Sequence, residues 1–70
     1  MSIFYTNHII ERLNHRGISK LAIEYILKNY YSQEEKNGIL ITEGTYEERE
    51  IRIISSVKKQ HIILVTAYYL

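Results

Sequence analysis

The sequence contains no cysteine, and no apolar run approaches the ~20 residues that a membrane-spanning helix requires. The missing cysteines exclude disulfides and thiolate metal sites, and they fit a reducing compartment. The N-terminus also lacks the pattern of a signal peptide. We therefore expect a soluble cytoplasmic protein with a single domain over residues 1–70, because a chain this short leaves no room for a second.

The chain also carries little net charge, +1 at pH 7, which argues against a strong sequence-independent hold on nucleic acid. The charges are unevenly spread, however. Residues 1–32 carry four cations against two glutamates, residues 33–50 carry two against six, and residues 51–70 carry three cations and no carboxylate. An acidic segment thus lies between two basic ones, and such local fields can attract an anion.

Two helices are expected in the first half of the chain, over residues 7–16 and 20–31, because apolar residues recur there at helical spacing. The polar run 32–38 ends in Asn-Gly and is typical of a loop. The residues expected to cap or end the helices are Thr6 or Asn7, Gly17 and Ser19.

From Gly38 onward the apolar period becomes two, which predicts strands. We expect strands over residues 39–42, 45–55 and 60–70, with turns at Glu43-Gly44 and Lys58-Lys59. The expected fold is therefore α+β, with two N-terminal helices packed on a three-stranded antiparallel sheet.

Matching apolar with apolar residues across the last two strands selects one sheet face for the core. That face would carry Ile51, Ile53, Ile63, Val65 and Ala67, with Ile62, Leu64, Thr66 and Tyr68 on the other. A turn one residue longer would exchange the cross-strand partners, and Lys58-Lys59 lacks the glycine or asparagine that would fix the register. The sheet register therefore stays open.

The stretch HIIERLNHRGIS, from His8 to Ser19, carries the clearest chemical pattern. His8, Arg12 and Arg16 stand four residues apart, so on a helix they lie one above the other within about 80° of arc. Apolar residues fill the adjacent arc. The three side chains thus form a strip along one edge of the buried face, where an anion could be held.

These residues carry a resemblance to a small bacterial and phage domain family of unknown function. Its members open with H-x3-R-x3-R-G-I-S, matched by residues 8–19, and close with a strand like I-V-T-x-Y, matched by Ile63, Val65, Thr66, Ala67 and Tyr68. That family is similar to RelE-type toxins of the barnase–EndoU–colicin–RelE group. The resemblance implies a RelE-like two-layer sandwich, and a toxin-type ribonuclease that cleaves RNA without a metal.

Metal-free RNA cleavage needs a base for the 2′-hydroxyl, donors for the charged phosphorane and an acid for the leaving oxygen. Histidine titrates near neutrality, and arginine donates to phosphate in pairs. No metal or cofactor is expected, because three histidines without neighbouring cysteine or aspartate make a poor ligand set. The candidate residues are His8 as acid or base, Arg12, Arg16 and Arg52 as phosphate holders, and Thr66 with Tyr68 as hydroxyl donors.

Structural explanations compete with each of these roles. Arg12 or Arg16 can pair with the glutamates of the acidic segment, and Arg52 can pair across strands with a glutamate. His15 can be an i+4 partner of Glu11, and Thr66 and Tyr68 favour strands in any case.

A non-catalytic binding module is the alternative function. The seven tyrosines suit a contact surface, and the final strand can pair with another chain at a sheet edge. The partners would be an antitoxin or an inhibited target, or a second copy in a homo-oligomer.

Overall fold

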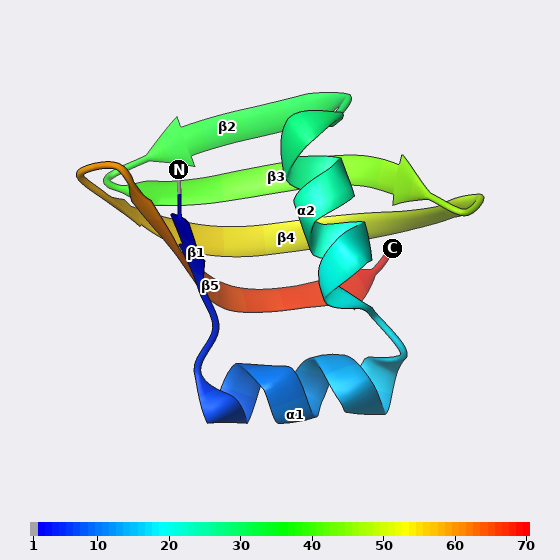
Figure 1. Ribbon diagram of the computed structural model, residues 1–70. Helices are drawn as coiled ribbons and strands as arrows, with labels where there is room; N and C mark the ends of the chain where they lie inside the picture. The colour runs from blue at the N-terminus through cyan, green and yellow to red at the C-terminus, as the bar shows by residue number, and fades with distance from the viewer. Residues whose placement is uncertain (1) are drawn as a thin grey trace.

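Residues 2–70, which the computed structural model describes, form two helices and five strands (Figure 1). The α+β class with two helices is confirmed. The expected sheet of three antiparallel strands is wrong, because the sheet has five strands and is mixed. The elements are β1 (Ser2–Phe4), α1 (Asn7–Arg16), α2 (Lys20–Lys28), β2 (Ser32–Lys36), β3 (Ile39–Tyr46), β4 (Arg49–Lys58) and β5 (His61–Tyr69).

The helices begin where their capping residues predict. The hydroxyls of Thr6 and Ser19 each accept a hydrogen bond at 3.1 Å from a backbone N–H three residues later. Gly17 ends α1 in the left-handed conformation, at φ 69°. The second helix is shorter than the expected 20–31 and ends at Lys28, because Asn29 leaves helical geometry and its side-chain amide donates to a carbonyl of the last turn.

The polar run 32–38 is a strand and a turn rather than the expected loop. Strand β2 pairs with β3 in antiparallel register, and Asn37 and Gly38 join them with φ of 54° and 80°. Positive φ at both turn positions is the geometry of the tightest hairpins, and asparagine and glycine are the residues that adopt it most readily. The turn signal was therefore right, but the hairpin strand before it was missed.

The predicted turn at Glu43-Gly44 is also wrong, since both residues lie inside β3. The hairpin turn lies at Glu47 and Glu48, with φ of 50° and 68°, so the expected strand 45–55 spans the end of β3, this turn and part of β4. Gly44 instead allows close packing of Ile26 against the sheet. A Cβ there would lie 2.7 Å from Cγ2 of Ile26, so glycine allows α2 to approach the sheet.

The N-terminal residues supply an edge strand that the sequence pattern did not predict. Strand β1 pairs in parallel with β5, which gives the order β1-β5-β4-β3-β2. The last hairpin turns at Lys59 and Gln60, one residue later than the predicted Lys58-Lys59. Met1 lies outside the described residues.

A β-bulge in β5 reverses part of the predicted core. Ser55 pairs with Leu64 while Ile54 pairs with Thr66, so Val65 is an extra residue between them. Alternation before the bulge therefore buries Ile62 and Leu64, whereas Ile63 is half-buried and Val65 is 45% exposed. The predicted core positions Ile51, Ile53 and Ala67 are confirmed, and Ile63 and Val65 are wrong.

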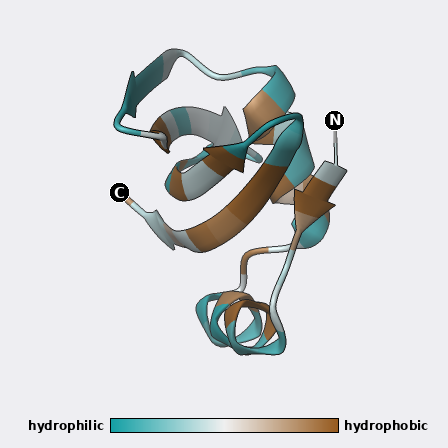
Figure 2. Ribbon diagram, turned by 90° about the vertical axis from the view of Figure 1, so that its left-hand side faces the viewer, coloured by the Kyte–Doolittle hydropathy of each residue, from teal (hydrophilic) through white to brown (hydrophobic). Residues whose placement is uncertain are grey.

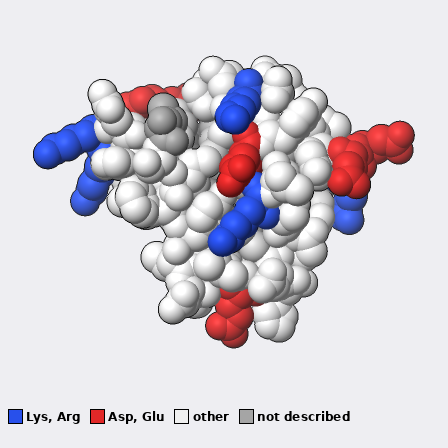
Figure 3. Space-filling model, viewed as in Figure 1, with Lys and Arg blue, Asp and Glu red and all other residues white. Residues whose placement is uncertain are grey.

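Helix α2 crosses one side of the sheet, which we call the helix face, and α1 lies beside β5 below the sheet (Figure 1). The apolar side of α1 is turned toward the sheet and its hydrophilic side away from it (Figure 2). Lysine and glutamate side chains alternate along the outer side of α2 (Figure 3). The core beneath is formed by Ile9, Leu13, Ile18, Ala22, Ile23, Ile26, Ile51, Ile53, Leu64 and Ala67.

The opposite side of the sheet, which we call the open face, lies under neither helix in residues 2–70. Cross-strand pairing places Glu43, Arg52 and Tyr68 in one row of this face. Ile54 and Thr66 form the next row. The predicted strand residues of the site therefore share a face, and that face is accessible. No helix in the described range is long and apolar enough to cross a membrane.

Candidate functional site

The strip on α1 forms as predicted, and its first two members bond to each other. The Nε of Arg12 donates a hydrogen bond to Nε2 of His8 at 3.0 Å, and both side chains are exposed. In this hydrogen bond Nε2 of His8 is the acceptor. Arg12 therefore does not pair with a glutamate, which was one of the open alternatives.

Arg16 joins the helix to the sheet. Its Nη1 donates to Oγ1 of Thr66 at 3.1 Å and to the carbonyl oxygen of Ala67 at 3.0 Å. Strand β1 pairs only with the first three residues of β5, so the later carbonyls at this edge need other partners. A hydrogen bond to a charged donor typically contributes about 1.5–3 kcal/mol. Arg16 thus has a structural role, in addition to any role in binding.

Arg52 lies on the open face between two partners. Its Nε forms an ion pair with Oε2 of Glu43 at 2.7 Å, and its Nη1 donates to the hydroxyl of Tyr68 at 3.1 Å. The hydrogen bonds to Tyr68 and Glu43 raise the pKa of the Arg52 guanidinium, so the side chain stays charged. The cross-strand pairing of Arg52 with a glutamate, one of the alternatives from sequence, is confirmed.

The six predicted residues form three pairs that follow one another along the molecule. Arg16 lies one helical turn beyond Arg12, and Thr66 and Tyr68 project from the same face of β5. We call this series the cationic line: His8, Arg12, Arg16, Thr66, Tyr68 and Arg52. The hydrogen bonds join His8 to Arg12, Arg16 to Thr66, and Tyr68 to Arg52, and no hydrogen bond in residues 2–70 joins one pair to the next.

Sequence reasoning missed the acidic end of this surface. Tyr31 Oη donates to Oε1 of Glu50 at 2.6 Å, and this bond raises the pKa of Tyr31 to about 12. Glu50 projects from β4 on the same face as Arg52. The spacing of Glu50 and Arg52 already placed them on one face, but nothing local pointed to Tyr31, which reaches the sheet only because its N–H bonds to the carbonyl of Glu43.

No residue of the cationic line contributes to either of two cavities that lie on the helix face. The two cavities, of about 570 and 320 Å³, are lined by residues of α2 and of the helix face. Within residues 2–70 no group of three or more histidine, cysteine or acidic side chains is placed to hold a metal ion. The line can therefore contact an extended anion along its length, but it does not enclose a small one.

Residues 5–69 match a family described as Domain of unknown function (DUF4258). The match covers both helices and strands β2 to β5, and with them all six residues of the cationic line. No curated protein matches the chain significantly, and neither does any solved structure.

Proposed function

The chain belongs to the DUF4258 family, whose description assigns no function, and we propose that it is a RelE-like, toxin-type domain that binds RNA along the cationic line and cleaves it without a metal. One observation carries the proposal. The contact of Arg16 with Thr66 brings a helix residue to the face of β5 that also carries Tyr68, the partner of Arg52. RNA is the anion whose repeated phosphates match such an extended series of arginines.

Each type of side chain in the cationic line has a distinct task in this proposal. Arg12, Arg16 and Arg52 hold successive phosphates, since each guanidinium keeps donors that its present hydrogen bonds do not use. Thr66 and Tyr68 present hydroxyls to the phosphorane. His8 takes the proton of the 2′-hydroxyl on Nε2 as that oxygen attacks phosphorus, and it returns the proton to the 5′-oxygen as the P–O5′ bond breaks. Nε2 is available for this only after Arg12 turns from it to a phosphate. Phosphate binding by Arg12 would thereby release the base.

The likeness to RelE-type toxins is part of the proposal. Two helices followed by a meander of antiparallel strands support it, because the resemblance implies that arrangement. The net charge of +1 gives RNA little long-range attraction, and the acidic residues at the end of the open face repel it.

Purified protein incubated with RNA and with ribosomes, in the presence of EDTA, tests the activity. We expect metal-independent cleavage and slower growth on expression in bacteria. His8→Ala should lower cleavage by about 10²–10⁴-fold, the usual contribution of a general acid or base. Arg12→Ala should weaken RNA binding, and Lys59→Ala, in the β4–β5 turn, is the charge-matched control.

Folding of each variant is checked by circular dichroism, because Arg16 and Thr66 also support the structure. Intact RNA after incubation with folded wild-type protein, together with unchanged growth, would refute the ribonuclease. Cleavage that survives in His8→Ala would refute the proton transfer by His8 but not the ribonuclease activity itself.

A second candidate is a non-catalytic binding module, and apolar side chains on the open face favour it. Ile39, Val65 and Phe4 are 38%, 45% and 51% exposed, and Ile41, Ile54 and Ile63 are half-buried. Lysines 36 and 58 flank this patch at one end, and Glu43 and Glu50 flank it at the other. Its charges are thus self-complementary, and the partner that fits is a second copy turned end to end.

The oligomeric state separates the two candidates. Light scattering coupled to size exclusion should find a dimer of wild-type protein that dissociates in Ile54→Glu, if the binding module is right. A monomer at all concentrations that retains no antitoxin or target protein from a cell lysate would exclude this candidate.

A further inference from the structure

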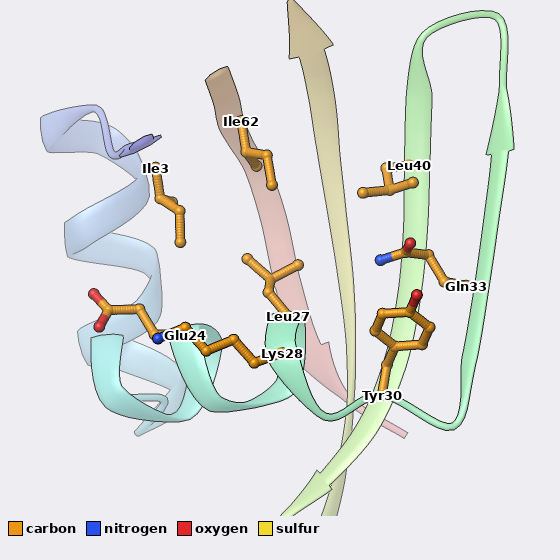
Figure 4. A pocket seen from close by; sticks show the side chains of 8 residues that line it. All are labelled: Ile3, Glu24, Leu27, Lys28, Tyr30, Gln33, Leu40 and Ile62. Atoms are coloured by element: carbon orange, nitrogen blue, oxygen red, sulfur yellow. The ribbon is translucent and has the colours of Figure 1, made fainter. Parts of the chain in front are cut away.

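The larger of these two cavities, about 570 Å³, lies on the helix face beside α2 (Figure 4). Its floor is aliphatic and is supplied by four different elements, through Ile3, Leu27, Leu40 and Ile62. A volume of this size lies within the range of small-molecule sites, and such sites are mostly apolar with a few polar groups. The cavity is therefore suited to the apolar body of a small ligand.

The cavity lies beside α2 because this helix covers only part of the helix face (Figure 1). The helix stops at Lys28, and the chain then passes through Tyr30 to the edge strand β2, which forms the far wall. Leu40 and Ile62, 8% and 4% exposed, line the part of the sheet next to α2. Burial of aliphatic surface against a cavity leaves contacts that a ligand can make.

At the rim of the cavity, the charged residues lie on one side and the neutral polar residues on the other (Figure 4). Glu24 and Lys28, one turn apart on α2, lie on the side of Ile3, while Tyr30 and Gln33 lie on the opposite side. The single ion pair within residues 2–70 is formed elsewhere, so Glu24 and Lys28 are not paired within 4.0 Å. One end of the cavity thus presents separate charges of both signs.

The opposite end presents neutral hydrogen-bonding groups. The amide nitrogen of Gln33 donates to Oγ1 of Thr42 at 3.0 Å, which orients the amide and leaves its oxygen free of that bond. The hydroxyl of Tyr30 points across the same end (Figure 4). Thr42 is fully buried, so the amide has a rigid support.

We propose that this cavity binds a free α-amino acid with a large apolar side chain. The ligand's ammonium would face Glu24 and its carboxylate Lys28, and its side chain would cover Leu27, Leu40 and Ile62. Residues four apart on a helix have Cβ atoms about 6 Å apart, which one head group with two charges can span. A ligand with a single charge would leave one rim charge without a partner.

Leucine and phenylalanine are the probes, and two analogues of leucine are their controls. 4-Methylpentanoate lacks the ammonium and 3-methylbutylamine lacks the carboxylate, while both keep the apolar body. Amide and methyl NMR spectra recorded during titration should shift at Ile3, Leu40 and Ile62, with saturation near ~1 mM, an affinity typical of a small ligand. Each analogue should bind more weakly than leucine, by up to about fivefold.

Charge variants test the head group. Glu24→Gln and Lys28→Gln should each weaken binding, and the exchange of both charges, Glu24→Lys with Lys28→Glu, should restore it because the ligand can reverse its head. Glu11→Gln on α1 is the control. Equal binding of either analogue, no effect of the single variants, or no saturable shifts with any probe would each overturn the proposal. RNA cleavage does not enter these measurements.

Discussion

At the scale of single residues, two tyrosines of the open face form hydrogen bonds with charged neighbours. Tyr68 accepts a hydrogen bond from Arg52, and Tyr31 donates one to Glu50. Seven tyrosines suggested a contact surface, but these two hydroxyls are already engaged within the chain. Removal of either hydroxyl should therefore affect its charged neighbour, Arg52 or Glu50, directly, and any bound partner only through that neighbour.

Tyr31 gives the domain a pH dependence in the alkaline range. Its pKa rises from the ordinary 10 to about 12, chiefly because the phenol donates to the Glu50 carboxylate. The folded state thus holds this proton more tightly than the unfolded chain. The stabilisation is complete below pH 10 and is lost as the pH rises through about 12.

Urea unfolding of wild type and Tyr31→Phe checks this. The difference in unfolding free energy should be larger at pH 9 than at pH 12. Burial also raises the pKa of Tyr5, so the comparison must be made against wild type at each pH. A constant difference across this range would contradict the Tyr31–Glu50 bond.

At the scale of elements, the bulge at Val65 decides which residues of β5 reach the core. Because Ser55 pairs with Leu64 and Ile54 with Thr66, removal of Val65 would leave a regular strand with every other side chain on its present face. We expect the Val65 deletion to fold and to unfold cooperatively, with a loss of about 1–2 kcal/mol.

Deletion of Ile54 is the matched control. That residue is paired on both sides, with Ile41 and Thr66, so its loss exchanges the faces of half of β4 and should prevent folding. Thermal unfolding followed by circular dichroism distinguishes the two. A Val65 deletion as disordered as the Ile54 deletion would show that the bulge itself is required.

The same elements show what the sequence could predict. Helix starts were correct because Thr6 and Ser19 act on backbone groups three residues away, and Gly17 acts on its own turn. The edge strands β1 and β2 were missed because a polar or short segment becomes a strand only through its neighbour. Gly44 suggested a turn, but a glycine stands there because Ile26, distant in sequence, packs too closely to leave room for a side chain.

The site was predictable to a similar extent. Helical spacing put His8, Arg12 and Arg16 in one strip, since that depends on one element. The partners of Arg16 on β5 depend on how α1 meets the sheet, which no local pattern encodes. Arg52 had two open explanations, and the register between β3 and β4 gave it Glu43.

At the scale of the whole molecule, the edge strand β2 carries charges that oppose its pairing with the edge of a second copy. Strand β2 is polar, is exposed along its length and has no neighbour on its outer side within residues 2–70. Antiparallel pairing of two such edges about their centres would place Glu34 opposite its own copy. Like charges directly opposite each other oppose pairing.

Replacement of Glu34 by threonine should remove this barrier. We expect the association constant to rise by about two- to fivefold, which corresponds to the energy of one cross-strand pair. Static light scattering over a concentration series measures it, with Glu11→Thr on α1 as the control for lost charge. Unchanged association would show that side chains other than Glu34 guard the edge.

The parallel pairing of β1 with β5 has a consequence for how the domain forms. Ser2 lies beside His61, so nearly the whole chain intervenes between two strands in direct contact. Contacts of such long sequence separation are slow to form, because the loop that they close must first lose its freedom. During synthesis the helices can form early, but β1 must wait for β5. Of the five strands of the sheet, the one that comes first in the chain is therefore the last to pair.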